Sequence, residues 1–201
     1  MIRIRTFIGR RLNYVNGILR RQIELDRPLK NREDVKLIYE YYEKPKNPID
    51  FFSKRFFLYP YNSKKKDKEK NTINHITYQL LGDLGLFLDK SKTIITCHDI
   101  FTFLEKRNIR NPLFLQKFYL SGLKKCRYII AISNFTKNEL NKKLKIPNDK
   151  IVVIKNGMLI EGVMDKNSLG EEFGLLLREL HKKIWPEFYS KYLRKNIHVR
   201  D

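Results

Sequence analysis

The chain has 201 residues, enough for one domain with a short appendage and too few for two α/β domains. Its 42 lysines and arginines outnumber 22 acidic residues, giving a net charge of +20. This charge suits nucleic acid, an anionic membrane surface or a phosphorylated substrate, although a solvated basic surface without a partner explains it equally well. The two cysteines, Cys97 and Cys126, lack metal-site spacing, and no apolar run approaches the roughly 20 residues that span a bilayer. We therefore expect a reduced, globular chain that is cytoplasmic, with attachment to the inner face of a membrane as an option.

The first part of the chain predicts two strands around a helix. Residues 1–8 alternate apolar and basic side chains and lead into Gly9, as a strand entering a turn does. Residues 12–25 have apolar side chains at helical spacing and end before Pro28, and residues 35–42 predict a second strand.

The next segment is harder to assign. The aromatic and basic run at 51–62 has no clear period, and its residues 56–59 fit a short strand. Residues 63–70 (SKKKDKEK) lack an apolar anchor, so we expect a solvated, mobile loop, with anion binding as the alternative. A short strand at 73–76 and an amphipathic helix at 78–88 follow.

Three runs rich in Ile and Val then organise the chain, at residues 93–96, 127–132 and 150–154. They are continuous rather than alternating, which is typical of parallel strands buried on both faces. The intervening segments predict a loop at 101–111 and a helix at 113–125, so the fold class is α/β. In such sheets, polar residues after the strands line the ligand crevice. These residues are His98, Asp99, Ser133 and Asn156.

Residues 134–144 predict a last helix of the domain, capped by Ser133. The pattern changes after Gly157, where residues 175–192 read as a helix interrupted at Pro186. We expect one α/β domain over residues 1–157 and a helical tail over residues 158–201.

The order of NHITYQLLGDLG, TIITCHDIF and LKKCRYIIAISNFTKNELNKKLKIPNDKIVVIKNG resembles the amino-terminal half of retaining glycosyltransferases of the GT-B type, family 4. The likeness is strong over residues 74–157 and weaker over residues 1–62. Its most specific part is residues 131–140 together with Ile146-Pro147, Lys150-Ile151 and Asn156-Gly157. The resemblance implies a Rossmann-like domain that shapes the acceptor site and faces a second domain that holds the nucleotide-sugar donor.

The resemblance also implies site residues. His98 matches the histidine near the reacting carbon of the donor sugar, so it is the candidate catalytic residue, and Asp99 beside it is a substrate-binding candidate. Gly9 matches a first-loop glycine at which the backbone can approach the donor diphosphate, although the family's doubled glycine is replaced by Gly9-Arg10. Ser133 and Thr136 match the strand-to-helix turn on the cleft side. The hinge into the second domain corresponds to Asn156 and Gly157.

Each candidate also has a purely structural explanation: an incidental histidine at His98, a turn former at Gly9 and a helix cap at Ser133. The chemistry asks for charge and N–H groups aimed at the donor phosphates and for a positioned acceptor hydroxyl. A glycosidase-like carboxylate pair, a metal and a cofactor other than the nucleotide-sugar substrate are not needed.

Nothing after Gly157 resembles the donor-binding domain of the family, so we expect a truncated or split transferase that is inactive alone. Its expected partners are a glycan or lipid-linked acceptor and a separate donor-binding polypeptide. The basic first helix, with Arg10, Arg11, Arg20 and Arg21, suits an anionic membrane surface. There are two alternatives, a non-catalytic scaffold and a basic nucleic-acid-binding protein that uses the aromatic run 51–61. Against the second, the sequence shows no recognised nucleic-acid-binding motif.

Overall fold

The computed structural model describes residues 1–10, 17–30, 32–43, 45–104, 113–155, 175–176 and 179. Within them lies a six-stranded sheet in the order β2-β1-β3-β4-β5-β6, and every neighbouring pair of strands is parallel. The predicted α/β class and its Rossmann-like arrangement are therefore confirmed. The strands are β1 (Ile2–Arg10), β2 (Val35–Tyr42), β3 (Thr72–Ile76), β4 (Thr93–Cys97), β5 (Tyr128–Ala131) and β6 (Ile151–Val153).

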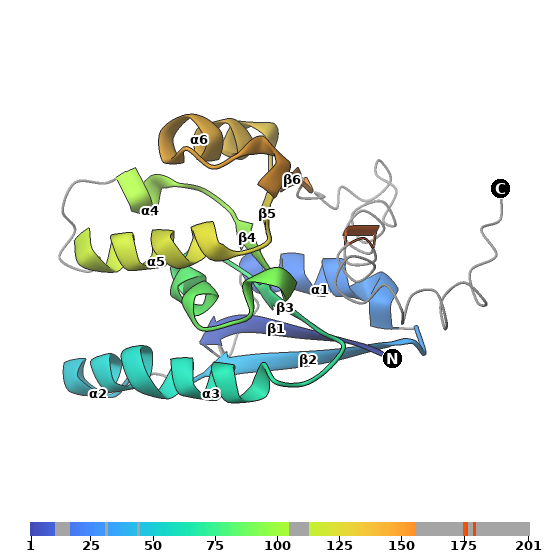
Figure 1. Cartoon of the computed structure of the whole chain (residues 1–201), viewed down its shortest axis with the longest axis horizontal. Coiled ribbons are helices and arrows are strands. Elements are labelled where there is room, and N and C mark those ends of the chain that lie inside the picture. Colours follow the sequence, from blue (N-terminus) through green and yellow to red (C-terminus); the bar gives the residue numbers. More distant parts are fainter. Residues whose placement is uncertain are drawn as a thin grey trace.

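Helices cover both faces of the sheet (Figure 1). One face is covered by α1 (Gly17–Lys30). The larger helices of the other face are α2 (Pro48–Ser53), the π-helical η1 (Lys54–Leu58), α3 (Tyr59–Lys66), the 3₁₀-helical η2 (Gln79–Leu86), α5 (Leu113–Lys125) and α6 (Asn134–Leu144). The short elements are η3 (Lys90–Lys92), α4 (Phe101–Leu104) and η4 (Asn148–Lys150).

The central parts of β4, β5 and β6 are apolar on both faces because each face has its own core. Ile94 and Ile130 pack with Leu25 of α1, whereas their chain neighbours Ile95 and Ile129 pack under η2, α5 and α6. Successive strand residues point to opposite faces, so a strand covered on both sides reads as a continuous apolar run. This is why the runs at 93–96, 127–132 and 150–154 identified β4, β5 and β6 correctly.

The expectation of a strand at residues 56–59 is wrong, because these residues lie in a continuous helical stretch from α2 through η1 to α3. Asn47 caps α2, with its side chain accepting a hydrogen bond from the Asp50 N–H, and Pro48 occupies the first turn. The π-helical turn precedes Pro60, whose ring would clash with the preceding turn of a regular α-helix. Phe56 packs on Phe118 of α5, a tertiary contact that local sequence does not reveal.

The solvated loop predicted at 63–70 is also only partly correct, because its first four residues belong to α3. Polar rather than apolar contacts fix the rest. The Asp67 carboxylate accepts a hydrogen bond from Asn74 at 2.6 Å, and Glu69 pairs with the buried Arg5 at 3.0 Å.

Several boundaries differ from the prediction. α1 continues through Pro28 to Lys30, and β1 extends to Arg10 with a register shift between Phe7 and Gly9. The helix expected at 78–88 is the 3₁₀ helix η2, and the loop expected at 101–111 begins with α4. The proposed boundary at residue 157 and nearly all of the proposed tail lie outside the described residues.

Candidate active site

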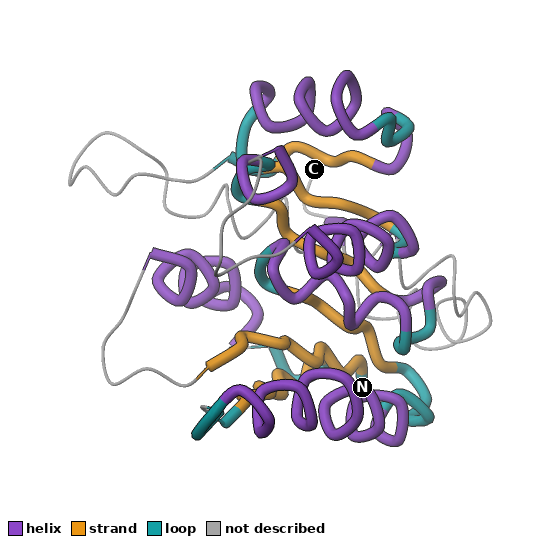
Figure 2. Tube along the Cα trace, turned by 90° about the vertical axis from the view of Figure 1, so that its left-hand side faces the viewer, coloured by secondary structure: helices purple, strands orange, loops and turns teal. Residues whose placement is uncertain are grey.

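The sheet has one point at which the chain changes direction across it. The chain runs from β1 outward to β2, then returns to the other side of β1 as β3 and continues outward in the opposite direction. Ligands of open parallel sheets bind outside the carboxyl ends of the strands at such a switch. Figure 2 looks onto this end of the sheet, which we call the carboxyl edge.

Gly9 lies at the carboxyl end of β1 in a conformation that favours glycine. Its φ is +92°, in the region that L side chains rarely adopt, and it follows the register shift in β1. A Cβ at this position would lie 3.1 Å from the Tyr78 hydroxyl and 3.2 Å from a carbon of its ring. The loop after β3 therefore packs directly on Gly9 and joins it to the switch point.

His98 follows β4 and is held by the same loop. Its ring Nε2 lies 3.1 Å from the carbonyl oxygen of Thr77, and its backbone N–H donates to Gln79 Oε1 at 3.2 Å. Because a carbonyl can only accept, Nε2 must carry the proton, and Nδ1 is the acceptor of the neutral ring. Thr77 is fixed in turn by two hydrogen bonds to the carbonyl oxygen of Phe7 in β1.

Burial is the largest cause that lowers the pKa of His98, and the positive charge of Arg21 adds to it. The Thr77 carbonyl and the Asp99 carboxylate act in the opposite direction without reversing the shift. The imidazole of His98 is therefore neutral at pH 7.

Ser133 and Thr136 join the β5–α6 turn to His98. Ser133 caps α6, with its Oγ accepting the Thr136 N–H at 3.1 Å, as predicted. The Thr136 hydroxyl donates to the His98 carbonyl oxygen at 3.3 Å and is almost fully buried. The pair thus fixes the backbone of His98.

The structure describes Asp99 but not the hinge candidates. The Asp99 carboxylate accepts the backbone N–H of Phe101 at 3.1 Å, so it caps the start of α4 beside His98. Asn156 and Gly157, the predicted hinge, lie outside the described residues.

A buried polar layer lies beneath the site on the face covered by α1. The Nε2 of His75 lies 2.9 Å from the Thr96 hydroxyl, and both residues are fully buried in neighbouring strands. Arg21 of α1 donates to the Ile154 carbonyl oxygen at 3.0 Å, and burial lowers its pKa to about 10. Burial is the largest cause that lowers the pKa of His75 to about 3, and the positive charge of Arg21 adds to it. His75 is therefore neutral, and the cationic group of this layer is Arg21.

Sequence reasoning missed Thr77, Tyr78, Gln79 and Arg21 as site residues. The first three directly follow the buried strand β3, and the rule that selected His98 and Ser133 applies to them equally. Arg21 was assigned to the basic outer side of its helix, but only 7% of it is exposed. Its burial becomes visible only when α1 is docked on the sheet.

The sequence that forms these strand ends matches a known family. The model of Glycosyltransferase Family 4 matches residues 24–161, about two thirds of the chain. The chain belongs to glycosyltransferase family 4. The matched region contains His98, Asp99, Ser133 and Thr136, whereas Gly9 precedes it.

Two curated relatives share only short stretches with this family 4 chain. The DNA-directed RNA polymerase subunit Rpo1N of Methanocaldococcus jannaschii is 46% identical over 57 residues, which are 28% of this chain and 4% of that subunit. Rpo1N of Methanococcus vannielii is 38% identical over 52 residues, 26% of this chain and 6% of the subunit. The chain thus spans a small fraction of either subunit.

Two further observations concern metals and membranes. Among the described residues, no group of three or more His, Cys, Asp or Glu side chains is placed to hold a metal ion. In the same part of the chain, no helix has the length and apolar character needed to cross a bilayer.

Proposed function

We propose that the chain is the acceptor-side domain of a retaining GT-B glycosyltransferase, which transfers a sugar from a nucleotide-sugar donor to a glycan or lipid-linked acceptor. The observation that carries this proposal is the family 4 match over residues 24–161. The contacts that link Gly9, Tyr78, His98 and Thr136 along the carboxyl edge support it, because they create a fixed edge at the switch point.

His98 is the proposed catalytic residue. Sugar transfer develops positive charge at the reacting carbon, as in the oxocarbenium-like transition states of glycosidases. A neutral imidazole does not oppose that charge, whereas an imidazolium would. Burial and Arg21 keep the ring neutral, so the polar layer beneath the site serves the chemistry.

The remaining candidates have positioning and binding roles in this proposal. Gly9 lets the donor diphosphate approach the backbone, and Asp99 offers its carboxylate to a substrate hydroxyl at the same edge. Ser133 and Thr136 support His98, since their hydroxyls bond to each other and to its backbone. The hinge assigned to Asn156 and Gly157 would lead toward a second domain that faces this edge.

The donor would be held by that second domain, supplied as a separate polypeptide or by further chain. The described domain alone would then transfer sugar poorly, since the diphosphate needs a cluster of positive charge and N–H donors at the moment of transfer. In this proposal the transferase draws on the nucleotide-sugars of the cytoplasm, so the reaction would take place there. A lipid-linked acceptor would place it at the inner face of a membrane. The first helix supports membrane attachment only in part, because Arg20 is exposed whereas Arg21 is buried.

The test is a transfer assay with and without a donor-binding family 4 domain, including the product of any reading frame directly downstream. A panel of nucleotide-sugars and of glycan and lipid-linked acceptors would be screened for release of the nucleoside diphosphate. We expect release only with both domains, and His98→Ala should lower its rate by at least 100-fold, or about 3 kcal/mol of transition-state stabilisation.

The matched control is Lys142→Ala, an exposed position on α6 that should leave the rate unchanged. If the wild type and His98→Ala show the same rate, His98 is not catalytic. If no donor and acceptor pair gives release with a donor domain that binds the chain, the chain is a non-catalytic scaffold.

A nucleic-acid-binding function is the second candidate, favoured by the net charge of +20 and by the short likeness to subunits named as DNA-directed RNA polymerase components. Binding of a single-stranded oligonucleotide should then weaken steeply between 50 and 200 mM salt, because each neutralised phosphate releases a counterion. Weak binding already at the lower salt concentration would exclude it.

A further inference from the structure

Exposed apolar side chains gather on one surface outside the candidate active site. Phe57 is 74% exposed, Ile49 82% and Tyr61 67%, although all three lie on well-formed helix. Four neighbours are about half exposed. We call the whole set the aromatic face: Ile49, Phe52, Phe57, Leu58 and Tyr61 of the α2-η1-α3 helix, and Leu113 and Phe114 of α5.

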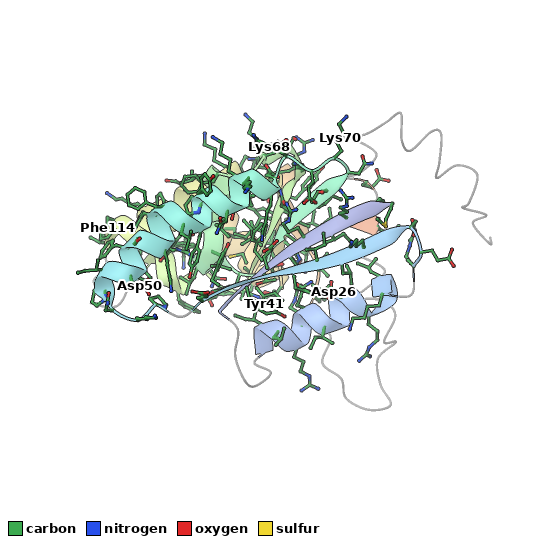
Figure 3. All side chains as sticks on the ribbon, turned by 90° about the horizontal axis from the view of Figure 1, so that it is seen from below. Asp26, Tyr41, Asp50, Lys68, Lys70 and Phe114 are labelled. Atoms are coloured by element: carbon green, nitrogen blue, oxygen red, sulfur yellow. The ribbon has the colours of Figure 1, made fainter. Side chains whose placement is uncertain are left out.

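Ring contacts show that the two helices of the aromatic face lie side by side. Phe52 stacks on Phe56 with ring centroids 5.6 Å apart, and Phe56 contacts Phe118 of α5 at 5.2 Å. Phe114 precedes Phe118 by one turn, just as Phe52 precedes Phe56. Figure 3 places Phe114 at the same end of the molecule as Asp50 of α2. The inner rings thus join the helices, and the outer apolar side chains form a shared surface.

Lysines continue the exposed side of the same helix. Lys64 and Lys65 follow Tyr61 by about one turn and are exposed, and Lys68 and Lys70 lie beyond the helix end, opposite Asp50 in Figure 3. The nearby carboxylates are already paired with cations. Lys54 bridges Glu43 and Asp50 at 3.2 and 3.1 Å, Asp67 pairs with Lys92, and Glu69 pairs with Arg5.

We propose that the aromatic face and Lys64, Lys65, Lys68 and Lys70 bind the surface of an anionic lipid bilayer. Helices that lie in the bilayer interface combine Phe and Leu side chains, which enter the acyl boundary, with lysines, which meet anionic headgroups. A contiguous exposed apolar patch marks an interaction site in a folded protein. Attachment of this kind is peripheral and needs no spanning helix.

Other occupants fit less well. A second copy of the chain would bring a like charge of +20 against the lysines. A nucleic acid strand could stack on Phe and Tyr, but Ile49, Leu58 and Leu113 offer no ring to a base. A lipid surface accommodates both aliphatic and aromatic side chains.

The orientation of the helices brings the aromatic face next to the carboxyl edge of the sheet. Helices that follow parallel strands begin at the carboxyl edge, and α2 begins shortly after β2 ends. In Figure 1 the starts of α2 and α5 lie at the end of the molecule toward which β1 points. A bilayer that takes up the aromatic face would therefore lie beside the carboxyl edge, within reach of a lipid-linked acceptor. The binding itself does not rest on the proposed sugar transfer.

Flotation with vesicles tests the proposal. The full chain should float with vesicles of phosphatidylcholine and 30% phosphatidylglycerol and stay unbound with phosphatidylcholine alone. Phe57→Ser should weaken partitioning about tenfold, because one buried aromatic side chain is lost. The pair Lys64→Gln and Lys65→Gln should weaken it about 30-fold, from roughly fivefold for each lysine near an anionic surface.

Matched controls separate this surface from general charge and hydrophobicity. Phe135→Ser removes a ring that is 67% exposed on α6, and the pair Lys124→Gln and Lys125→Gln removes two adjacent exposed lysines from the end of α5. Both should bind like the wild type, and circular dichroism confirms that each variant is folded. Equal losses for test and control variants, or unchanged flotation of Phe57→Ser, would overturn the proposal.

Two further readouts identify other outcomes. If Phe57→Ser abolishes binding of a single-stranded oligonucleotide while vesicles are never bound, the face belongs to nucleic acid and the lipid proposal fails. Transfer to a water-soluble acceptor, where it is measured, should be the same for Phe57→Ser and the wild type. Failure of the proposed transferase function would leave the flotation result unchanged, so the two proposals fail separately.

Discussion

The close approach of η2 and α5 makes Gly122→Ala a sensitive test of the fold behind the site. A Cβ at Gly122 would lie 2.0 Å from the carbonyl oxygen of Gly82, and one at Gly82 would lie 2.4 Å from that of Tyr119. Ordinary contact begins at 3.4 Å, so Gly122→Ala needs the backbones to separate by about 1.4 Å. The start of η2 carries Gln79, which accepts from the His98 backbone N–H, so the strain reaches the candidate site.

The sign of the effect is informative because Ala in place of Gly normally stabilises a helix interior by about 1 kcal/mol. Overpacking costs about 1–3 kcal/mol, and more where backbone must move. We expect Gly122→Ala to lose about 2 kcal/mol net in urea unfolding at 25 °C. Gly17→Ala is the control: a Cβ there meets nothing within 4 Å, so it should not destabilise. If Gly122→Ala is as stable as the wild type, η2 and α5 do not pack backbone against backbone.

Three further predictions concern polar groups that the fold holds in place. Ser133→Ala should cost about 1 kcal/mol in urea unfolding through loss of the α6 cap, and unchanged stability would count against the cap. Burial raises the pKa of Asp26 to about 6, above an unfolded value near 3.9. The free energy of unfolding should therefore decrease as pH rises from about 4 to about 6, and Asp26→Asn should remove on the order of 3 kcal/mol of that decrease. If the wild type and Asp26→Asn lose stability in parallel over this pH range, the reasoning is refuted. Arg55→Met removes the cation that pairs with the fully buried carboxylate of Asp83. The free energy of unfolding should therefore fall by about 3–5 kcal/mol at pH 7, and by less at pH 5, where the carboxyl group takes up a proton. An equal loss at both pH values would contradict the pairing.

The sequence revealed the sheet because burial on both faces leaves a local signal. Ile94-Ile95 and Ile129-Ile130 serve two cores at once, so their strands appear as apolar runs without further information. The same runs locate the carboxyl edge, and this is how His98 and Ser133 were found, whereas Thr136 came from the resemblance to family 4. Their mutual hydrogen bonds follow from the parallel register of β4 and β5.

The errors arise where tertiary contacts override local preference. Residues 56–59 have aromatic side chains that favour strands, but the Asn47 cap and the contact of Phe56 with Phe118 place them in a helix. The lysine-rich segment after them lacks apolar anchors, yet Arg5 and Asn74 of the neighbouring strands hold it through charge and hydrogen bonds. Partners distant in sequence supply both effects.

Arg21 connects the basic composition to the chemistry of the site. A helix with arginines on its outer side suggests surface electrostatics, and Arg20 fits that description. Arg21, one residue later, points into the protein and is held by the Ile154 carbonyl oxygen. A buried guanidinium stays protonated at pH 7 even with its pKa lowered to about 10, so its positive charge acts on His75 and His98 with little screening by solvent. One part of the net charge thus adds to burial in keeping the candidate catalytic imidazole neutral, and it does so because α1 packs on the sheet face that carries His75 and Thr96.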